Sequence, residues 1–555
     1  MGKIYQRIIA TLLVALMMTA LAACGGQPED TDDPIVETDK WDPYSPYNET
    51  IVMTKGVTVA AQGSFKEGEN FENNVFTRYL KNTMNIETKV LWEVDAALYD
   101  QKIALSIAIQ EIPDIMVVDR IIYKQLLDND LIWDMTEAYE KCISPFLKEQ
   151  YDSYGERLFK EVEVDGKLMG IPGTSLGNCH NVLWIRKDWL DKLGMDAPTT
   201  LDEVIDTARA FKKLNYNGQN NTVGLTTTSD IYGGYNSWWG LDTIFSYYGA
   251  YPGVWLERDG KAVYGSILPE VKTALAKLRD LYAEGILDRE FAIRNEADRQ
   301  QLLGSGRLGM YFSVWWPSNG VPDSTINDKN AEWIAVSAPA DANGKLKVPQ
   351  NDPVQHIMIV SKKFKHPEAA IKALNAGYDV LRCNTSETNP YAEQAAEAYR
   401  YFMDTTPNAW KAMPIPIEIN YEDCVRITME DIENAIKAED PSVMRIKGFE
   451  ASYEMVLLNR QKPKESYAAY LEEMARIVGA RAASAGNVEL IPTCFYGNTR
   501  TMSTMWSSLK KMENEAMLKI ITGEADIDSF DDFVSKWLRA GGQRITDEVE
   551  AERIK

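Results

Sequence analysis

The sequence predicts an α/β protein built from two or more lobes. Its 555 residues exceed what one hydrophobic core usually organises, so a single compact domain is not expected. Between residues 50 and 128, strand-like and helix-like segments alternate, which is the order of a doubly wound sheet. The composition is 45% hydrophobic and 25% charged, which is typical of a globular chain and excludes a disordered or multi-span membrane protein.

Local patterns define the elements in chain order. Runs of apolar and β-branched residues predict strands, and apolar residues at helical spacing predict helices. The predicted strands cover 50–62, 86–92, 113–118, 167–172 and 181–185. The predicted helices cover 71–84, 98–109, 121–128 and 187–193, and the chain is mostly helical from about 420 to its end. Thr200 is the expected N-cap of a further helix, because Glu203 follows at capping-box spacing.

The first 24 residues have the pattern of a bacterial export signal. Lys3 and Arg7 precede an apolar run over 8–20, which is shorter than the ~20 residues that a membrane-spanning helix needs. The run ends in Leu-Ala-Ala-Cys, which resembles a lipobox and implies that Cys24 carries the lipid (palmitate) and is the first mature residue. The alternative is an ordinary signal peptide with a chance cysteine. We expect a signal peptide over 1–23 and, from the Pro, Asp, Glu and Gly content, a flexible tether over 24–47.

The charge balance narrows the classes of partner. The chain has 82 acidic and 59 basic residues and a net charge of −23, which repels phosphate backbones and argues against a nucleic-acid partner. Three histidines leave little material for histidine metal sites or general bases. Besides Cys24, five widely spaced cysteines lack a C-x-x-C motif, so neither a disulfide framework nor a zinc site is expected; one disulfide stays open.

Two short motifs resemble catalytic or nucleotide-binding signatures in the wrong context. Residues 173–177 match G-x-S-x-G around Ser175, but a nucleophile elbow needs a helix next, and a strand-like segment follows instead. Residues 304–309 match G-x-G-x-x-G, but they follow a helix-like segment and precede a strand-like one, the reverse of the dinucleotide-binding order. We expect no hydrolase serine and no dinucleotide site.

A set of longer motifs resembles one known family. The segment WIRKDWLDKLG, followed by PTTLDE, is similar to family 1 extracellular solute-binding lipoproteins, the capture components of ABC importers, which mostly carry carbohydrates. The resemblance covers essentially the whole mature body and is closest to the longer, Gram-positive-type members. The matching segments are 113–115, 170–172, 184–194, 198–203, 281–288, 520–523 and 530–533.

The resemblance implies the fold and the partners. The fold would be a two-lobe, periplasmic-binding-protein-like clamp with hinge crossings and a helical C-terminal region, closing on its ligand. Lobe one would hold 48–172 and 355–400, and lobe two would hold 178–350 and 401–555. The implied protein is a monomer without cofactors that is lipid-anchored on the extracellular face of the cell membrane. It would capture a carbohydrate, expected to be an oligosaccharide, and pass it to ABC permease subunits.

Candidate ligand-binding residues follow from the same resemblance. Aromatic rings can pack on the apolar face of a sugar, and adjacent tryptophans on a strand point to opposite faces, so one of each pair would stack on the ligand. Asp119 and Arg120 follow the strand at 113–118, where a related maltose-binding protein contacts sugar; the alternative is a surface ion pair. We expect a neutral or weakly charged sugar, unless Arg120 or Arg186 is locally exposed. The candidates are Asp119, Arg120, Trp238, Trp239, Trp315 and Trp316.

A calcium loop of the longer family members is degraded here. Asn215, Asn217 and Asn221 could offer oxygen ligands, but Lys213 occupies the first position and the loop contains no carboxylate. Because a hard dication prefers negatively charged oxygen ligands, we expect an ordinary Asn/Gly turn and no metal.

Three functions compete at this point. The preferred one is a binding protein without catalysis. The second is a surface-anchored carbohydrate-active enzyme that works through two carboxylates. The third is a non-catalytic wall-associated scaffold or sensor. A ligand-binding lipoprotein can also feed a sensor kinase rather than a permease, and the sequence does not separate these two uses. The first predicts single-site binding with lobe closure, the second predicts product formation, and the third predicts neither.

Overall fold

The structure is a computed structural model that describes most of the chain. The described residues are 41–59, 65–175, 180–214, 221–234, 237–341, 343–403, 409–486 and 488–553. The described residues from Asp42 onward belong to one compact unit, which does not include Trp41. The predicted signal peptide, Cys24 and most of the predicted tether therefore lie outside the described residues. Within those ranges, none of the helices combines the length and the apolar character that crossing a membrane requires.

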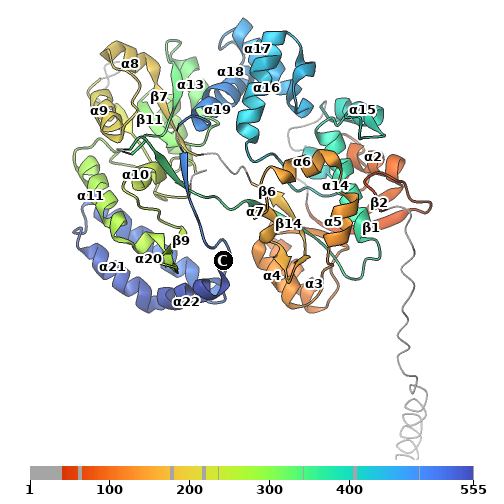
Figure 1. Ribbon diagram of the computed structural model, residues 1–555. Helices are drawn as coiled ribbons and strands as arrows, with labels where there is room; N and C mark the ends of the chain where they lie inside the picture. The colour runs from red at the N-terminus through yellow and green to blue at the C-terminus, as the bar shows by residue number, and fades with distance from the viewer. Residues whose placement is uncertain are drawn as a thin grey trace, which may run out of the picture. The chain divides into compact units, whose positions relative to one another are not determined.

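The first lobe is built on a five-stranded sheet with the order β2-β1-β3-β14-β6 (Figure 1). β1 (Ile51–Thr58) pairs in parallel with β2 (Ile86–Val94) and with β3 (Ile115–Val118), so the carboxyl ends of these strands lie at one edge. β14 (Val354–Val360) lies antiparallel between β3 and β6 (Ile171–Thr174). The last two strands thus bring distant parts of the chain to the first three.

Helices cover this sheet on both sides, with α2 and α14 on one side and α3 and α4 on the other (Figure 1). α2 begins at Val75, later than predicted, because Asn74 and Thr77 form a capping box at that point. The helices of this lobe are α2 (Val75–Met84), α3 (Tyr99–Ala108), α4 (Arg120–Asp128), α5 (Thr136–Cys142), α6 (Pro145–Asp152), α7 (Arg157–Lys160), α14 (Pro367–Leu381) and α15 (Ala392–Met403).

The strand predicted over 167–172 is two strands. β5 (Lys167–Leu168) pairs with β4 (Glu163–Val164) in a small hairpin, and β6 then joins the large sheet. Gly170 lies between them, where an added Cβ would be 2.6 Å from the Ile357 side chain. The change of partner at this close approach was not visible in the sequence pattern.

The second lobe contains a four-stranded sheet with the order β12-β7-β11-β8. β7 (Val182–Arg186) is antiparallel to both β11 (Leu308–Ser313) and β12 (Trp333–Ser337), and β8 (Val223–Leu225) runs parallel to β11. All residues of β7 and β11 are buried. Both strands therefore have continuous apolar sequences, as expected for strands covered on both faces.

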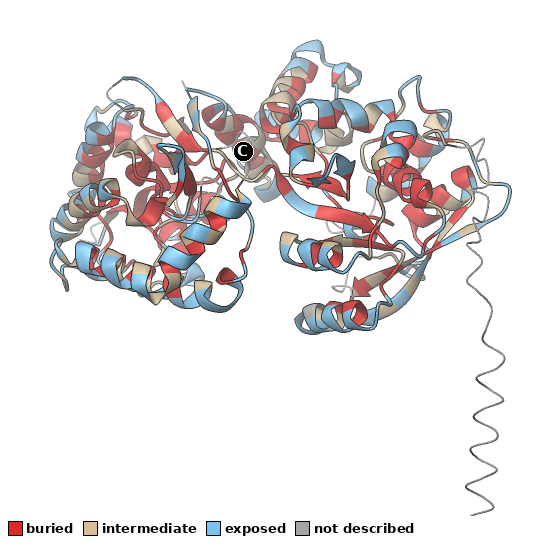
Figure 2. Cartoon of the chain, turned by 60° about the horizontal axis from the view of Figure 1, so that its bottom comes forward, coloured by how far each residue is buried: buried red, intermediate tan, exposed pale blue. Residues whose placement is uncertain are grey.

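The two faces of this sheet contribute to two separate hydrophobic cores. Leu183 and Ile185 of β7 belong to one core, whereas Val182 and Trp184 belong to the other, because successive side chains of a strand alternate. Figure 2 shows the buried residues on the inner strands and inner helix faces and the exposed residues on the outer ones.

The helices of the second lobe divide between these cores. The first core packs α8 (Lys187–Leu193), α9 (Leu201–Lys212), α10 (Asp242–Tyr247), α11 (Pro269–Ala283), α20 (Met502–Thr522), α21 (Ser529–Trp537) and α22 (Gln543–Glu552). The second core packs α12 (Glu296–Gly304), α13 (Gly320–Asn327), α16 (Cys424–Ala438), α17 (Glu450–Gln461), α18 (Tyr467–Glu473) and α19 (Ala480–Ala483). The predicted helical character after 420 is confirmed, and α9 begins at the predicted Thr200–Glu203 capping box.

The chain passes between the two sheets more than once. β6 leads to β7, and β12 leads through β13 (Leu346–Pro349) to β14. β13 pairs in parallel with β15 (Val488–Ile491), a strand that the sequence did not predict, and β9 (Trp255–Arg258) forms a hairpin with β10 (Lys261–Tyr264). Residues 413–419 contact the first lobe before the chain enters α16: Tyr378 donates to the Ile417 carbonyl at 2.8 Å.

The predicted context of the G-x-G-x-x-G motif is confirmed. α12 ends at Gly304 and β11 begins at Leu308, so the motif joins a helix to a strand. Gly306 has a φ of 73°, which favours glycine at this turn. Among the described residues, Cys142, Cys383, Cys424 and Cys494 are buried and form no disulfide.

Candidate ligand-binding site

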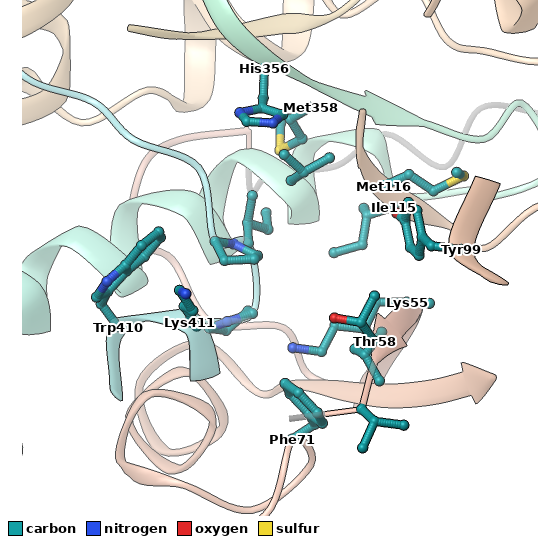
Figure 3. A pocket seen from close by; sticks show the side chains of 17 residues that line it. Lys55, Thr58, Phe71, Tyr99, Ile115, Met116, His356, Met358, Trp410 and Lys411 are labelled. Atoms are coloured by element: carbon teal, nitrogen blue, oxygen red, sulfur yellow. The ribbon is translucent and has the colours of Figure 1, made fainter. Parts of the chain in front are cut away.

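A pocket of about 460 Å³ lies at the carboxyl ends of β1 and β3 in the first lobe. β1 and the residue after it contribute 55–59, β3 contributes 115–117, and β14 contributes His356 and Met358. The segment 410–416, which is remote in sequence, closes another side (Figure 3). In open α/β sheets, ligands bind at the carboxyl ends of the strands, so this position is that of a binding site.

A local irregularity of β1 places the pocket's lysine. The pairing of β1 with β2 shifts register between Lys55 and Gly56, and such irregularities redirect side chains. A Cβ at Gly56 would lie 2.2 Å from the Trp92 ring of β2. Glycine is therefore favoured at 56, because any larger residue there would displace the Trp92 ring.

Aromatic side chains form much of the wall. Phe71 and Tyr99 come from the first half of the lobe and Trp410 comes from the remote segment (Figure 3). The Tyr99 ring is held against Trp92, with centroids 5.7 Å apart. Lys411 Nζ lies 5.9 Å from the Trp410 ring centroid. Such walls offer flat apolar faces beside polar groups, the usual composition of a small-molecule site.

Lys55 is the one buried cation of this wall. Its side chain is 5% exposed, and its Nζ donates a hydrogen bond to the Met413 carbonyl at 3.0 Å. Figure 3 shows the amino group between Phe71 and the 410–416 segment. Burial lowers the pKa of Lys55 to about 7, although the charge of Glu72 opposes this shift. The cost of burying an ammonium group explains the direction of the shift.

The structure places Asp119 and Arg120 beside β3, but in intramolecular contacts. Asp119 is the N-cap of α4 and accepts from the Ile122 amide at 2.8 Å. Arg120 forms ion pairs with Glu161 at 2.8 Å and with Asp352 at 2.5 Å. Neither residue lines the pocket described above.

The four candidate tryptophans are divided between core and surface. Trp239 and Trp315 are buried, 1% and 6% exposed, and Trp239 Nε1 donates to Glu296 at 3.3 Å. Trp238 is 37% exposed and Trp316 is half-buried, and their rings meet edge to face with centroids 5.9 Å apart. The structure thus brings Trp238 and Trp316 together and sends the other two into the core. None of the four lines the first-lobe pocket.

Among the described residues, the remaining candidates form no metal, catalytic or ligand-binding site. Asn215 and Asn217 lie outside them, and the carbonyl of exposed Asn221 accepts from Arg307 at 3.2 Å. No cluster of three metal-binding side chains occurs among the residues described. Ser175 Oγ donates to the Asp352 carbonyl, and β7 rather than a helix begins at Val182. Arg186 is fully buried and pairs with Asp188 at 2.7 Å, so it is not locally exposed.

The fold and the position of the pocket are those of a two-lobed binding protein, and comparisons with known proteins agree. Residues 163–378 match the model of the bacterial extracellular solute-binding protein family. The resemblance inferred from the sequence motifs is therefore confirmed.

Individual relatives match most of the chain. It is 23% identical over 480 residues to the polygalacturonan/rhamnogalacturonan-binding protein YtcQ of Bacillus subtilis, covering 85% of this chain and 86% of that protein. It is 22% identical over 472 residues to the lipoprotein LipO of the same organism, covering 83% and 84%.

A third relative also has a solved structure. The fructooligosaccharide ABC transporter substrate-binding protein FusA of Streptococcus pneumoniae is 23% identical over 285 residues, 49% of this chain and 51% of FusA. An EF-hand mutant of FusA in complex with fructo-nystose superposes with a TM-score of 0.56 at 15% identity, covering 90% of this chain and 98% of that one. The predicted periplasmic-binding-protein-like fold is confirmed.

Sequence reasoning missed the side chains of the first-lobe pocket. Lys55, Phe71, Tyr99 and Trp410 are spread over more than 350 positions, and no spacing rule joins them. One signal was available: Lys55 interrupts the strand pattern IVMTKGVT at a position that the alternation assigns to the buried side. A lysine at a core position indicates a special role more often than a surface lysine does.

Proposed function

We propose that this protein captures an oligosaccharide outside the cell and delivers it to the permease of an ABC importer. The family match and the relatives YtcQ and FusA, whose names specify pectic polysaccharides and fructooligosaccharides, support a carbohydrate ligand. Both relatives are named as binding proteins. We propose likewise that this chain binds without catalysis and acts as a monomer.

The observation that carries the proposal is the pocket at the carboxyl ends of β1 and β3. Its volume of about 460 Å³ falls within the range of small-molecule sites, about 300–1,000 Å³. Phe71, Tyr99 and Trp410 supply aromatic faces of the kind that pack on sugar rings. Lys55, His356 and Lys411 supply hydrogen-bond donors for the sugar's polar groups.

The proposed mechanism is closure of the two lobes around the sugar. Each lobe has its own sheet and its own buried hydrophobic residues, and the chain crosses between them in several extended segments, which is the construction of hinged binding proteins. Trp238 and Trp316 form the exposed aromatic pair of the second lobe, and we propose that they meet the sugar from that side. Arg120, paired with Asp352 of a crossing segment, would act in the hinge rather than on the sugar.

The test is a titration of the purified chain with a panel of oligosaccharides by calorimetry, combined with small-angle scattering. Single-site binding with a decrease in radius of gyration is the expected result. Release of shorter sugars during the titration would favour the carbohydrate-active enzyme instead. Binding without any growth defect when the adjacent permease genes are deleted would favour the sensor.

We also propose that Cys24 anchors the protein to the outer face of the membrane. The support is the lipobox-like sequence at 21–24 and the similarity to a protein named as a lipoprotein. Cys24→Ser is expected to release the protein into the medium, as measured by fractionation and immunoblotting. A variant that stays with the membrane would contradict the lipid anchor.

A further inference from the structure

The charge of the first-lobe pocket is opposite to that of the chain. The chain has a net charge of −23, yet the residues that line this pocket include three basic side chains, Lys55, His356 and Lys411, and no carboxylate. Lys411 and His356 are exposed and lie on different sides of the pocket, and the buried Lys55 points its amino group into the pocket above Phe71 (Figure 3). The local field therefore favours an anion, whereas the net charge alone predicted a neutral ligand.

Lys55 has no charged partner close by. Its Nζ donates to a backbone carbonyl, and no carboxylate of the described residues forms an ion pair with it. The nearest acidic influence is Glu72, whose carboxylate is occupied by the Val90 amide at 2.8 Å and by Lys89 at 3.1 Å. A buried ammonium without a counter-ion is costly, so its retention next to a pocket indicates a ligand group that compensates the charge.

This inference rests on the proposed function and deepens it. We infer that the pocket is a subsite for an acidic sugar, a uronic acid unit of the oligosaccharide, whose carboxylate pairs with Lys55 while its ring packs on the aromatic wall. A uronic carboxylate is bonded directly to the ring, so the charge and the apolar C–H face lie close together. The pocket presents the same combination, with Lys55 next to the Phe71 ring at 5.5 Å from its centroid.

A purely structural role for Lys55 makes a different prediction. If its hydrogen bond to Met413 only fastens the 410–416 segment, loss of the amino group would weaken all ligands equally and lower the melting temperature. A role in ligand charge recognition would instead change the preference between acidic and neutral sugars. The two roles are separated by a selectivity measurement rather than by affinity alone.

The experiment uses the purified chain and three matched pairs of trisaccharides. Each pair contains a uronate, built from galacturonate, glucuronate or mannuronate, and the same trisaccharide after carboxyl reduction. Calorimetry is expected to show at least one uronate bound about tenfold or more tightly than its reduced partner, the effect of one charge-assisted contact. Lys55→Met should remove about ten- to 100-fold of the affinity for the uronate and reduce the affinity for the reduced sugar by a much smaller factor, so that the preference for the uronate falls.

Controls make each outcome decisive. Lys148→Met removes an exposed lysine on α6 that pairs with Asp152, and it should change neither affinity. If Lys55→Met does not fold, Lys411→Gln at the exposed end of the pocket should still reduce the preference for the uronate. Equal binding of the paired sugars, or an unchanged preference in these variants, would overturn the acidic subsite and leave the proposed function standing. Failure of every oligosaccharide to bind would overturn both.

Discussion

Each lobe contains a lysine that is at least partly buried, and the two lysines differ in the groups that surround them. Lys510 of α20, in the second lobe, donates to the hydroxyls of Tyr232 and Tyr264 and lies 3.6 Å from the Glu513 carboxylate. Lys55, in the first lobe, has a single carbonyl acceptor. Burial lowers the pKa of both ammonium groups; Glu513 opposes this shift at Lys510 by its charge and a hydrogen bond, whereas Glu72 opposes it at Lys55 by its charge alone. Lys510 therefore completes a structural network within the protein, whereas the charge of Lys55 can be balanced by a bound ligand.

The network around Glu513 should give the largest effect on stability. Its carboxylate is fully buried and accepts from Tyr264 at 3.0 Å and from Tyr232. Glu513→Ala leaves two buried hydroxyls and the Lys510 charge uncompensated, so we expect a loss of about 3–5 kcal/mol of unfolding free energy in the second lobe. Urea unfolding followed by tryptophan fluorescence measures it. Glu513→Gln, which retains an acceptor, should lose less, and equal losses would contradict the network interpretation.

For Lys55→Met we expect the opposite effect, an increase in the free energy of unfolding. The pKa of Lys55 falls from 10.5 to about 7 on folding, so the unfolded chain binds more protons between these values and the cost of the buried charge is complete below pH 7. Lys55→Met should therefore stabilise the ligand-free protein on the order of 1–4 kcal/mol at pH 6, because Met has a similar shape without a charge. The gain should shrink as pH rises towards 10.5. Thermal unfolding at pH 6 and 9.5 tests this, and a destabilised variant at pH 6 would refute it.

The comparison extends from the lysines to the aromatic residues of the two lobes. Trp410→Ala removes a wall of the first-lobe pocket and should weaken oligosaccharide binding by about 1–3 kcal/mol, about five- to 150-fold, without loss of the fold. Trp238→Ala tests the exposed second-lobe pair in the same way. Trp239→Ala is the matched control for burial, because its ring belongs to the core and its loss should lower stability. Wild-type affinity in both Trp410→Ala and Trp238→Ala would place the site elsewhere.

The smallest change in stability is expected for Ser175→Ala. The Ser175 hydroxyl donates to the Asp352 carbonyl, so Ser175→Ala should cost about 0.5–1.5 kcal/mol of stability at most and leave sugar binding intact. No ester or glycoside hydrolysis is expected from the wild type or the variant. A hydrolytic activity that disappears in Ser175→Ala, measured with chromogenic substrates, would reverse the assignment of this chain as a binding protein.

Much of the fold could be predicted because its signals are local. The Thr200–Glu203 capping box fixes the start of α9 through hydrogen bonds within one turn, and the order of α12 and β11 around Gly306 is visible in adjacent residues. The family motifs, each a few residues long, also fixed the two-lobed fold. The lobe boundaries stay a prediction, since residues such as Ile417 contact the first lobe although they follow its expected end.

The binding site depended on the tertiary structure. Adjacent tryptophans such as Trp238 and Trp239 are separated, one exposed and one buried, although their sequence context is shared. Lys55 and Trp410 meet at one pocket because the parallel pairing of β1 with β3 and the return of a remote segment bring them to the same edge of the sheet. The class of protein, many of the helices and strands and the net charge could be predicted from the sequence, because they depend on local hydrogen bonds, periodicity and composition. The sign of the charge inside the pocket depends on the packing of distant segments, which brings Lys55, His356 and Lys411 together, without a carboxylate, in a chain that has an excess of acidic residues.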